Sequence, residues 1–168
     1  MKKLTPKGIK ILKIFHLIFI MIWAMGVVTM TILCLLTPQS GDELYMIFKI
    51  TRTIDDVLVI PGAVMSVITG IIYGLFTNWG FFKHKWITVK WICSIIIILL
   101  GTFYFSPILD NSLQMSDLSR DEVLNTPEIA KNIQIAFWGG ICQGSALIIL
   151  IIISVIKPWK NKTGNRKI

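Results

Sequence analysis

Four long apolar segments constrain this chain more than any other feature of its sequence. They cover residues 14–36, 56–77, 86–109 and 134–156, and each reaches the length of about 20 residues that a helix needs to cross a bilayer. The segments are continuously apolar instead of alternating, which disfavours membrane-spanning strands. We therefore predict an all-α protein, in which a four-transmembrane-helix bundle forms one integral membrane domain over residues 1–168.

The charged residues predict the orientation of these helices. Lysine and arginine gather before the first segment, between the second and third, and after the fourth, and these three regions contain no Asp or Glu. All nine acidic residues fall near the first or the third loop. The positive-inside rule therefore predicts that both the N- and the C-terminus are cytoplasmic and that the first and third loops are external.

The net charge of +8 does not indicate nucleic-acid binding. The basic residues follow the topology and form no patch interleaved with aromatic residues, so the anionic headgroups of the lipid bilayer are their expected partner. The three cysteines, Cys34, Cys93 and Cys142, form no Cys-x-x-Cys pair. Their spacing disfavours a disulfide-generating oxidoreductase.

Two short interfacial helices are expected in the external loops. Pro38 and Gly41 break the first helix, and residues 44–53 then form an amphipathic segment that should lie at the outer interface. In the third loop, Ser119 with Glu122 as its capping partner predicts the start of a short external helix.

Proline and small residues mark the second and third segments. Pro61-Gly62 should interrupt the second helix about one turn inside, and Pro107 should end the third. A stripe of small residues follows at four-residue spacing: Gly62, Ser66, Gly70 and Gly74. Close packing of helices explains this stripe, and a groove of small residues beside a kink also suits a flat, bulky cofactor.

Two ionisable side chains lie inside apolar segments. His16 is in the first turn of the first segment, and Trp23, two helical turns later, shares its face. Lys90 lies one turn inside the third segment, at a similar depth on the same predicted side. Such residues are candidates for function by default. The alternatives are a histidine satisfied by a neighbouring helix and a lysine that reaches back to the headgroups.

The order and near-spacing of several short motifs resemble the core of the bacterial membrane-bound protoporphyrinogen oxidases of the HemJ type, a plan that the CopD-like membrane domains share. These motifs are Phe15-His16, Trp23, Gly26, Pro61-Gly62 and Trp86-x-x-x-Lys90. The chain is also similar to an uncharacterised family of small predicted integral membrane proteins of the same group. That similarity runs through Arg52-Thr-Ile-Asp55, Pro61-Gly62, Thr69-Gly70 and Lys157-Pro158.

This resemblance implies a haem b site in a bacterial cytoplasmic (inner) membrane. It implies that His16 is the axial metal ligand, that Lys90 is a catalytic residue that pairs with a propionate or moves a proton, and that Trp23 and Gly62 also line the cofactor site. A porphyrin or a quinone would be the redox partner. The chain departs from the oxidases after its first helix, where Thr29, Thr31 and Cys34 replace basic and aromatic residues, so the resemblance does not fix the substrate.

Two other functions remain open at this stage. If the protein is an enzyme, a haem-dependent membrane oxidoreductase is expected; otherwise it is a membrane subunit or accessory protein whose Gly/Ser helix faces bind a membrane partner or a second copy. The third hypothesis is a transporter for copper or another small solute, for which Met21, Met25 and Met30 would be soft ligands.

Overall fold

The structure is a computed structural model that describes residues 3–77, 80–82, 84–120 and 122–157. Some residues that entered the charge and resemblance arguments lie outside this range: Lys2, Lys83, Asp121 and the basic tail from Pro158 onward. The described residues are helical throughout apart from their connections, and they contain no strand.

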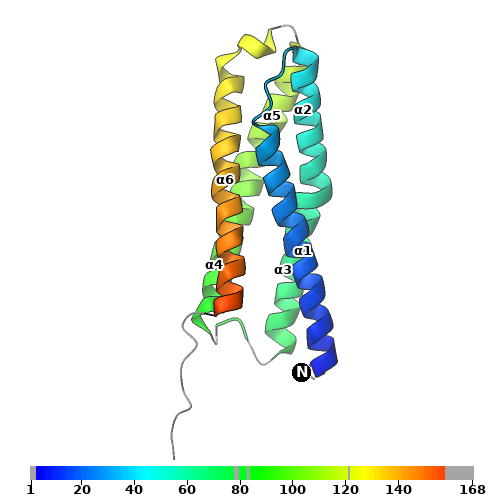
Figure 1. Cartoon of the computed structure of the whole chain (residues 1–168), viewed down its shortest axis with the longest axis vertical. Helices are drawn as coiled ribbons and strands as arrows, with labels where there is room; N and C mark the ends of the chain where they lie inside the picture. Colours follow the sequence, from blue (N-terminus) through cyan, green and yellow to red (C-terminus); the bar gives the residue numbers. More distant parts are fainter. Residues whose placement is uncertain (1–2, 78–79, 83, 121, 158–168) are drawn as a thin grey trace, which may run out of the picture.

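Four helices are long and apolar enough to span a membrane, which confirms the predicted bundle (Figure 1). The first is α1 (Pro6–Leu33) and the fourth is α6 (Pro127–Ile156). The second joins α2 (Gly41–Ile54), a π-helical turn η1 (Asp55–Val59) and α3 (Ile60–Phe76). The third joins α4 (Lys85–Leu100), a second π turn η2 (Gly101–Phe105) and α5 (Ser106–Leu118). A short 3₁₀ helix, η3 (Val123–Asn125), precedes α6.

Each π turn ends two residues before a proline. Pro61 and Pro107 each lack the N–H that the helix ladder needs, and each ring crowds the carbonyl group four residues earlier. In the wider π turn each N–H bonds to the carbonyl five residues earlier, which accommodates the missing hydrogen bond. The helix therefore continues past the proline. The prediction that Pro107 ends the third helix is therefore wrong, because α5 continues to Leu118.

The predicted interfacial helices need a correction as well. Residues 44–53 are helical, but α2 runs without a break through η1 into α3, giving a helix of 36 residues; the third helix has 34. At 1.5 Å per residue these helices are about 50 Å long, well beyond the roughly 30 Å of bilayer hydrocarbon. At the outer end of the second helix, Leu44 and Phe48 of α2 pack with Val123 of η3 and Ile129 of α6, and Leu113 of α5 packs against this cluster. The apolar side of residues 44–53 thus faces protein.

Ser119 ends a helix instead of starting one, so the predicted capping box is wrong. Its N–H donates to the carbonyl of Met115, and only the single turn of η3 follows. Arg120 ties this connection to α2, because its guanidinium lies 2.6 Å from Asp42 and 3.0 Å from Asp117. The hydrogen bonds to Asp42 and Asp117 raise the pKa of Arg120.

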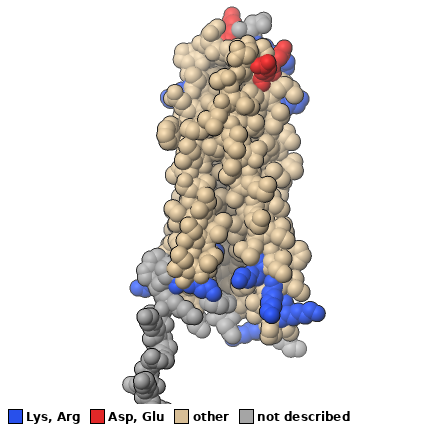
Figure 2. Space-filling model, viewed as in Figure 1, with Lys and Arg blue, Asp and Glu red and all other residues tan. Residues whose placement is uncertain are grey.

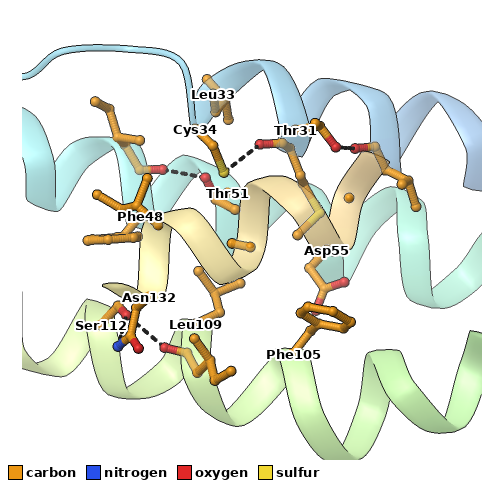
Figure 3. Close-up of a pocket in the computed structure, with 18 of the residues that line it drawn as sticks. Thr31, Leu33, Cys34, Phe48, Thr51, Asp55, Phe105, Leu109, Ser112 and Asn132 are labelled. Carbon is orange, nitrogen blue, oxygen red and sulfur yellow. Dashed lines mark hydrogen bonds between the residues drawn. The ribbon is translucent and has the colours of Figure 1, made fainter. Parts of the chain in front are cut away.

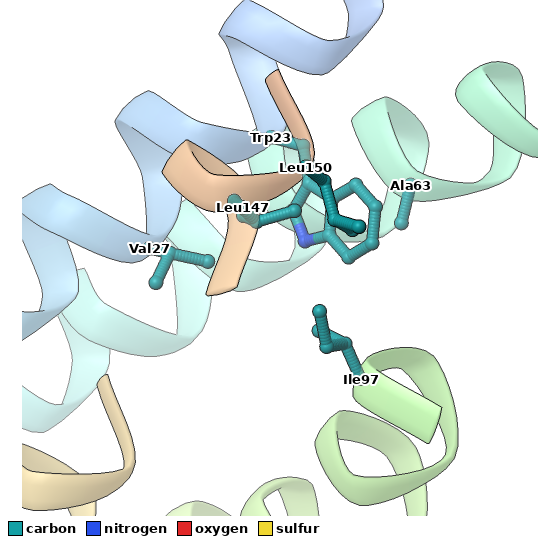
Figure 4. Packing of buried hydrophobic residues seen from close by; sticks show 6 residues of the cluster. All are labelled: Trp23, Val27, Ala63, Ile97, Leu147 and Leu150. Atoms are coloured by element: carbon teal, nitrogen blue, oxygen red, sulfur yellow. The ribbon is translucent and has the colours of Figure 1, made fainter. Parts of the chain in front are cut away.

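The buried core lies midway along the bundle, where side chains from α1, α3, α4 and α6 meet (Figure 4). It consists of Trp23, Val27, Ala63, Ile97, Leu147 and Leu150, and is called the central cluster below. α1 packs most extensively on α3. A Cβ atom at Gly62 would lie 2.7 Å from the backbone nitrogen of Trp23, so this close approach of α1 and α3 requires glycine.

The two ends of the bundle differ in charge (Figure 2). On the face shown, Lys and Arg collect at the end that holds the N-terminus, and Asp and Glu occur at the opposite end. We call these the basic end and the acidic end. The C-terminal turn of α6 also lies at the basic end.

Candidate functional site

A cavity of about 280 Å³ opens between α1, α3, α4 and α6 at the basic end. Its size approaches the lower limit of about 300 Å³ for small-molecule pockets. His16, Trp23 and Lys90 all line this cavity. The structure thus brings together three of the four residues that the sequence predicted for the cofactor site.

His16 is held by a residue of the neighbouring helix. Its Nδ1 lies 2.8 Å from the hydroxyl oxygen of Thr69 on α3. The Thr69 hydroxyl donates its proton to backbone carbonyls of its own helix, at 2.7 Å from Met65 and 3.0 Å from Ser66. With that proton on a carbonyl, the hydroxyl oxygen accepts from His16 Nδ1–H, and this arrangement favours the Nδ1–H tautomer of a neutral ring. That tautomer leaves the lone pair of His16 Nε2 for a ligand.

Lys90 is positioned by the fourth helix. Its ammonium donates to the hydroxyl of Ser154, which in turn donates to the carbonyl of Leu150 at 2.9 Å. The ammonium thus faces the bundle instead of reaching back to the headgroups. Lys13 and Lys157 also border the cavity, so its wall is basic and carries no carboxylate among the described residues.

The remaining walls are aromatic or small. Trp86 and Trp91 from α4 and Tyr73 from α3 line the cavity, and the Tyr73 and His16 ring centroids are 6.4 Å apart. Gly70 lies against Trp91, whose ring would be 3.4 Å from a Cβ atom at that position. A basic rim above flat aromatic walls suits an amphipathic anion with a planar body.

Gly62 does not join these residues. It belongs to the contact between α1 and α3 beside Trp23 and is not among the residues of the cavity wall. The other members of the small-residue stripe, Ser66, Gly70 and Gly74, do line the cavity. The stripe thus packs a helix at one end and borders the cavity at the other.

The sequence analysis assigned no role to Thr69 and Ser154, the two hydroxyl residues that orient His16 and Lys90. The sequence nevertheless contains a polar pattern that marks each of them. Ser66, Thr69 and Tyr73 form a polar line at intervals of three and four residues within an apolar helix. Ser154 is the only polar side chain in the last ten residues of α6. Polar groups inside a membrane helix are expected to find partners across helices, and these do.

The methionine and glycine patterns do not gather at a site. Met21 and Met25 are 60% and 63% exposed on the outer face of the bundle. The described residues hold no group of three or more His, Cys, Asp or Glu side chains that could bind a metal ion. Three of the glycines are used for packing inside the bundle. A Cβ atom at Gly26, Gly62 or Gly140 would contact Val59, Trp23 or Thr31 of the same chain, respectively.

Comparison of the sequence with known protein families agrees with this helical membrane architecture. No curated protein and no solved structure matches the chain. Residues 9–158 match the profile of a family described as predicted integral membrane protein (DUF2269). The match includes all four membrane-length helices except the first three residues of α1. Because this match covers most of the sequence, the chain belongs to the DUF2269 family of predicted integral membrane proteins, and it is a multi-pass membrane protein.

Proposed function

We propose that this protein binds haem b in the cavity at the basic end and takes part in redox chemistry of a bacterial cytoplasmic membrane. The observation that carries the proposal is the convergence of His16, Trp23 and Lys90 on one ligand-sized cavity. The resemblance to HemJ-type oxidases is the reason for choosing haem among planar ligands. The basic end would face the cytoplasm, in line with the positive-inside rule.

The residues around the cavity fit this group. Neutral imidazole is a common ligand of haem iron, and metal-binding histidines usually donate their second ring N–H to a neighbouring acceptor. Thr69 is such an acceptor for His16. Two lysines, Lys13 and Lys90, would bind the propionates, and the aromatic walls would contact the macrocycle. When bound, haem b supplies one-electron transfer.

The chain's own residues would hold the ligand and manage charge. Lys90 Nζ can hold a proton and pass it on, because a lysine ammonium changes its protonation readily when it is enclosed. A redox partner from the membrane, a porphyrinogen or a quinone, would reach the ligand through this cavity between α1, α3, α4 and α6. In this proposal the protein is a haem-dependent membrane oxidoreductase.

Absorbance spectroscopy of the detergent-purified protein, oxidised and reduced, tests the proposal. Protein from haem-replete cells should show a Soret band, and His16→Ala should lose it. His84→Ala is the matched control, because His84 is the only other histidine and is not part of the cavity wall. A colourless preparation of wild-type protein, or a Soret band that His16→Ala leaves unchanged, would contradict haem binding through His16.

A further inference from the structure

A second cavity, of about 110 Å³, lies on the other side of the central cluster, toward the acidic end (Figure 3). Val27 of the central cluster borders this cavity, whereas Trp23 of the same cluster borders the cavity that contains His16. The walls are mostly aliphatic and aromatic side chains. The charged group among them is Asp55, from the start of the π turn η1.

Among the described residues, Arg52 is the cation beside Asp55, and two other carboxylates share it. Arg52 Nη1 lies 3.5 Å from Asp55, and Arg52 Nε lies 3.5 Å from Asp56 and 3.4 Å from Asp110. One positive charge therefore faces three negative ones. Arg52 also donates to the hydroxyl of Ser106 at 2.9 Å, so its hydrogen-bonding capacity is divided further.

The three carboxylates differ in access to water. The side chains of Asp56 and Asp110 are 51% and 53% exposed, whereas that of Asp55 is 13% exposed. An incompletely balanced negative charge is least stable where solvent is excluded. Of the three groups, Asp55 is therefore the one whose negative charge most needs a bound cation or a proton.

A proton fits this place better than a metal ion. Ca²⁺ and Mg²⁺ need about six oxygen ligands, whereas the described wall offers one carboxylate, and its hydroxyl groups at Thr31, Thr51 and Ser112 are bonded to carbonyls of their own helices. Binding a proton removes the charge without any further ligand.

The same cavity has a polar group that points to water as the proton's exchange partner. Gln143 lines the cavity, and its side-chain Nε2 is buried with no hydrogen-bond partner among the described residues. A buried amide in that state is stabilised by a water molecule, and each water needs only about 10–15 Å³ of such a cavity. The cavity can therefore hold several water molecules between Asp55 and Gln143.

Both π turns border this cavity. Asp55 opens η1, and Gly101 and Phe105 are the first and last residues of η2. Figure 3 shows Asp55 and Phe105 facing each other across the space between their helices. π turns inside helices often occur at functional sites, where they turn a chosen side chain inward.

We propose that Asp55 is a proton-binding site inside the helix bundle, whose carboxyl group carries a proton at neutral pH and exchanges it with water in the cavity that Gln143 lines. Asp56 and Asp110 share Arg52 on the more exposed side of the cluster. This site is separate from the cavity of His16, and its existence does not depend on haem binding.

Infrared difference spectroscopy of the full-length protein in lipid nanodiscs, between neutral and alkaline pH, tests this inference. The neutral sample should show the C=O stretching band of a protonated carboxyl group. Asp55→Asn should abolish the band, and the matched variants Asp56→Asn and Asp110→Asn should retain it. Gln143→Leu should shift its frequency by removing a polar neighbour. A neutral spectrum without the band, or a band that Asp55→Asn retains, would overturn the proposal.

A second measurement covers the case in which Asp55→Asn does not fold. Dicyclohexylcarbodiimide adds to protonated carboxyl groups in apolar surroundings, and mass spectrometry locates the modified residue in the wild-type protein. With the infrared band present, modification of Asp55 ahead of Asp56 and Asp110 assigns the proton to Asp55. Modification of Asp56 or Asp110 in its place would refute the assignment.

Discussion

The Nδ1 atom of His16 and the hydroxyl oxygen of Thr69 lie 2.8 Å apart and join α1 to α3 at the edge of the basic-end cavity. This hydrogen bond orients the imidazole and selects its tautomer. Thr69→Val keeps the shape of the side chain and removes the acceptor. If His16 binds haem, the affinity for haem should fall roughly 10- to 100-fold, the usual effect of losing such a partner.

Haem titration of the apoprotein, followed at the Soret band, measures this change. Thr69→Ser retains the hydroxyl and should bind like the wild type. Equal affinities for Thr69→Val and the wild type would show that the hydrogen bond has no part in ligand binding.

Lys90 should raise the reduction potential of a haem bound beside it. A nearby positive charge stabilises the reduced, less positive form of the iron centre. Lys90→Met should therefore lower the potential, by on the order of 60 mV if the charge is worth a factor of ten in the equilibrium constant. Lys85→Met is the control, since Lys85 is exposed and outside the cavity wall. Redox titration that finds the two variants equal would remove Lys90 from the site.

Gly62 should be required for stability because it allows the backbones of α1 and α3 to approach. A methyl group at this position would overlap the backbone of Trp23, at 2.7 Å from the nitrogen and 3.0 Å from Cα. Gly62→Ala should reduce the free energy of unfolding by about 1–3 kcal/mol, as overpacking usually does. Gly144→Ala is the matched control, because a Cβ atom there meets nothing within 4 Å. Unfolding of both variants in mixed micelles gives the comparison, and equal stability would contradict the tight contact.

The basic end should face the cytoplasm. In a background without the three native cysteines, a membrane-impermeant maleimide should label Ser119→Cys in intact cells. The same reagent should label Lys7→Cys only after the cells are permeabilised. The opposite pattern would show that the positive-inside rule gives the wrong orientation for this chain.

The sequence by itself determined the fold class and the set of helices. Runs of apolar residues long enough to span a bilayer can satisfy their backbone groups only as helices. The number and order of the helices therefore follow from where these runs lie in the sequence. The distribution of charge predicted which helix ends lie together, and it placed His16 and Lys90 at the same depth. The structure puts both side chains in one cavity.

Only the tertiary structure decided how each helix is rotated and where it ends. Lipid and the bundle interior are both apolar, so hydrophobic periodicity does not show which face of a membrane helix is turned inward. Packing of α1 against α3 buried Gly62 beside Trp23, and it set Thr69 against His16. Both long helices continue beyond their prolines through the π turns η1 and η2. Asp55, the first residue of η1, lies in the wall of the second cavity. These features depend on contacts between segments far apart in the chain, which no local pattern encodes.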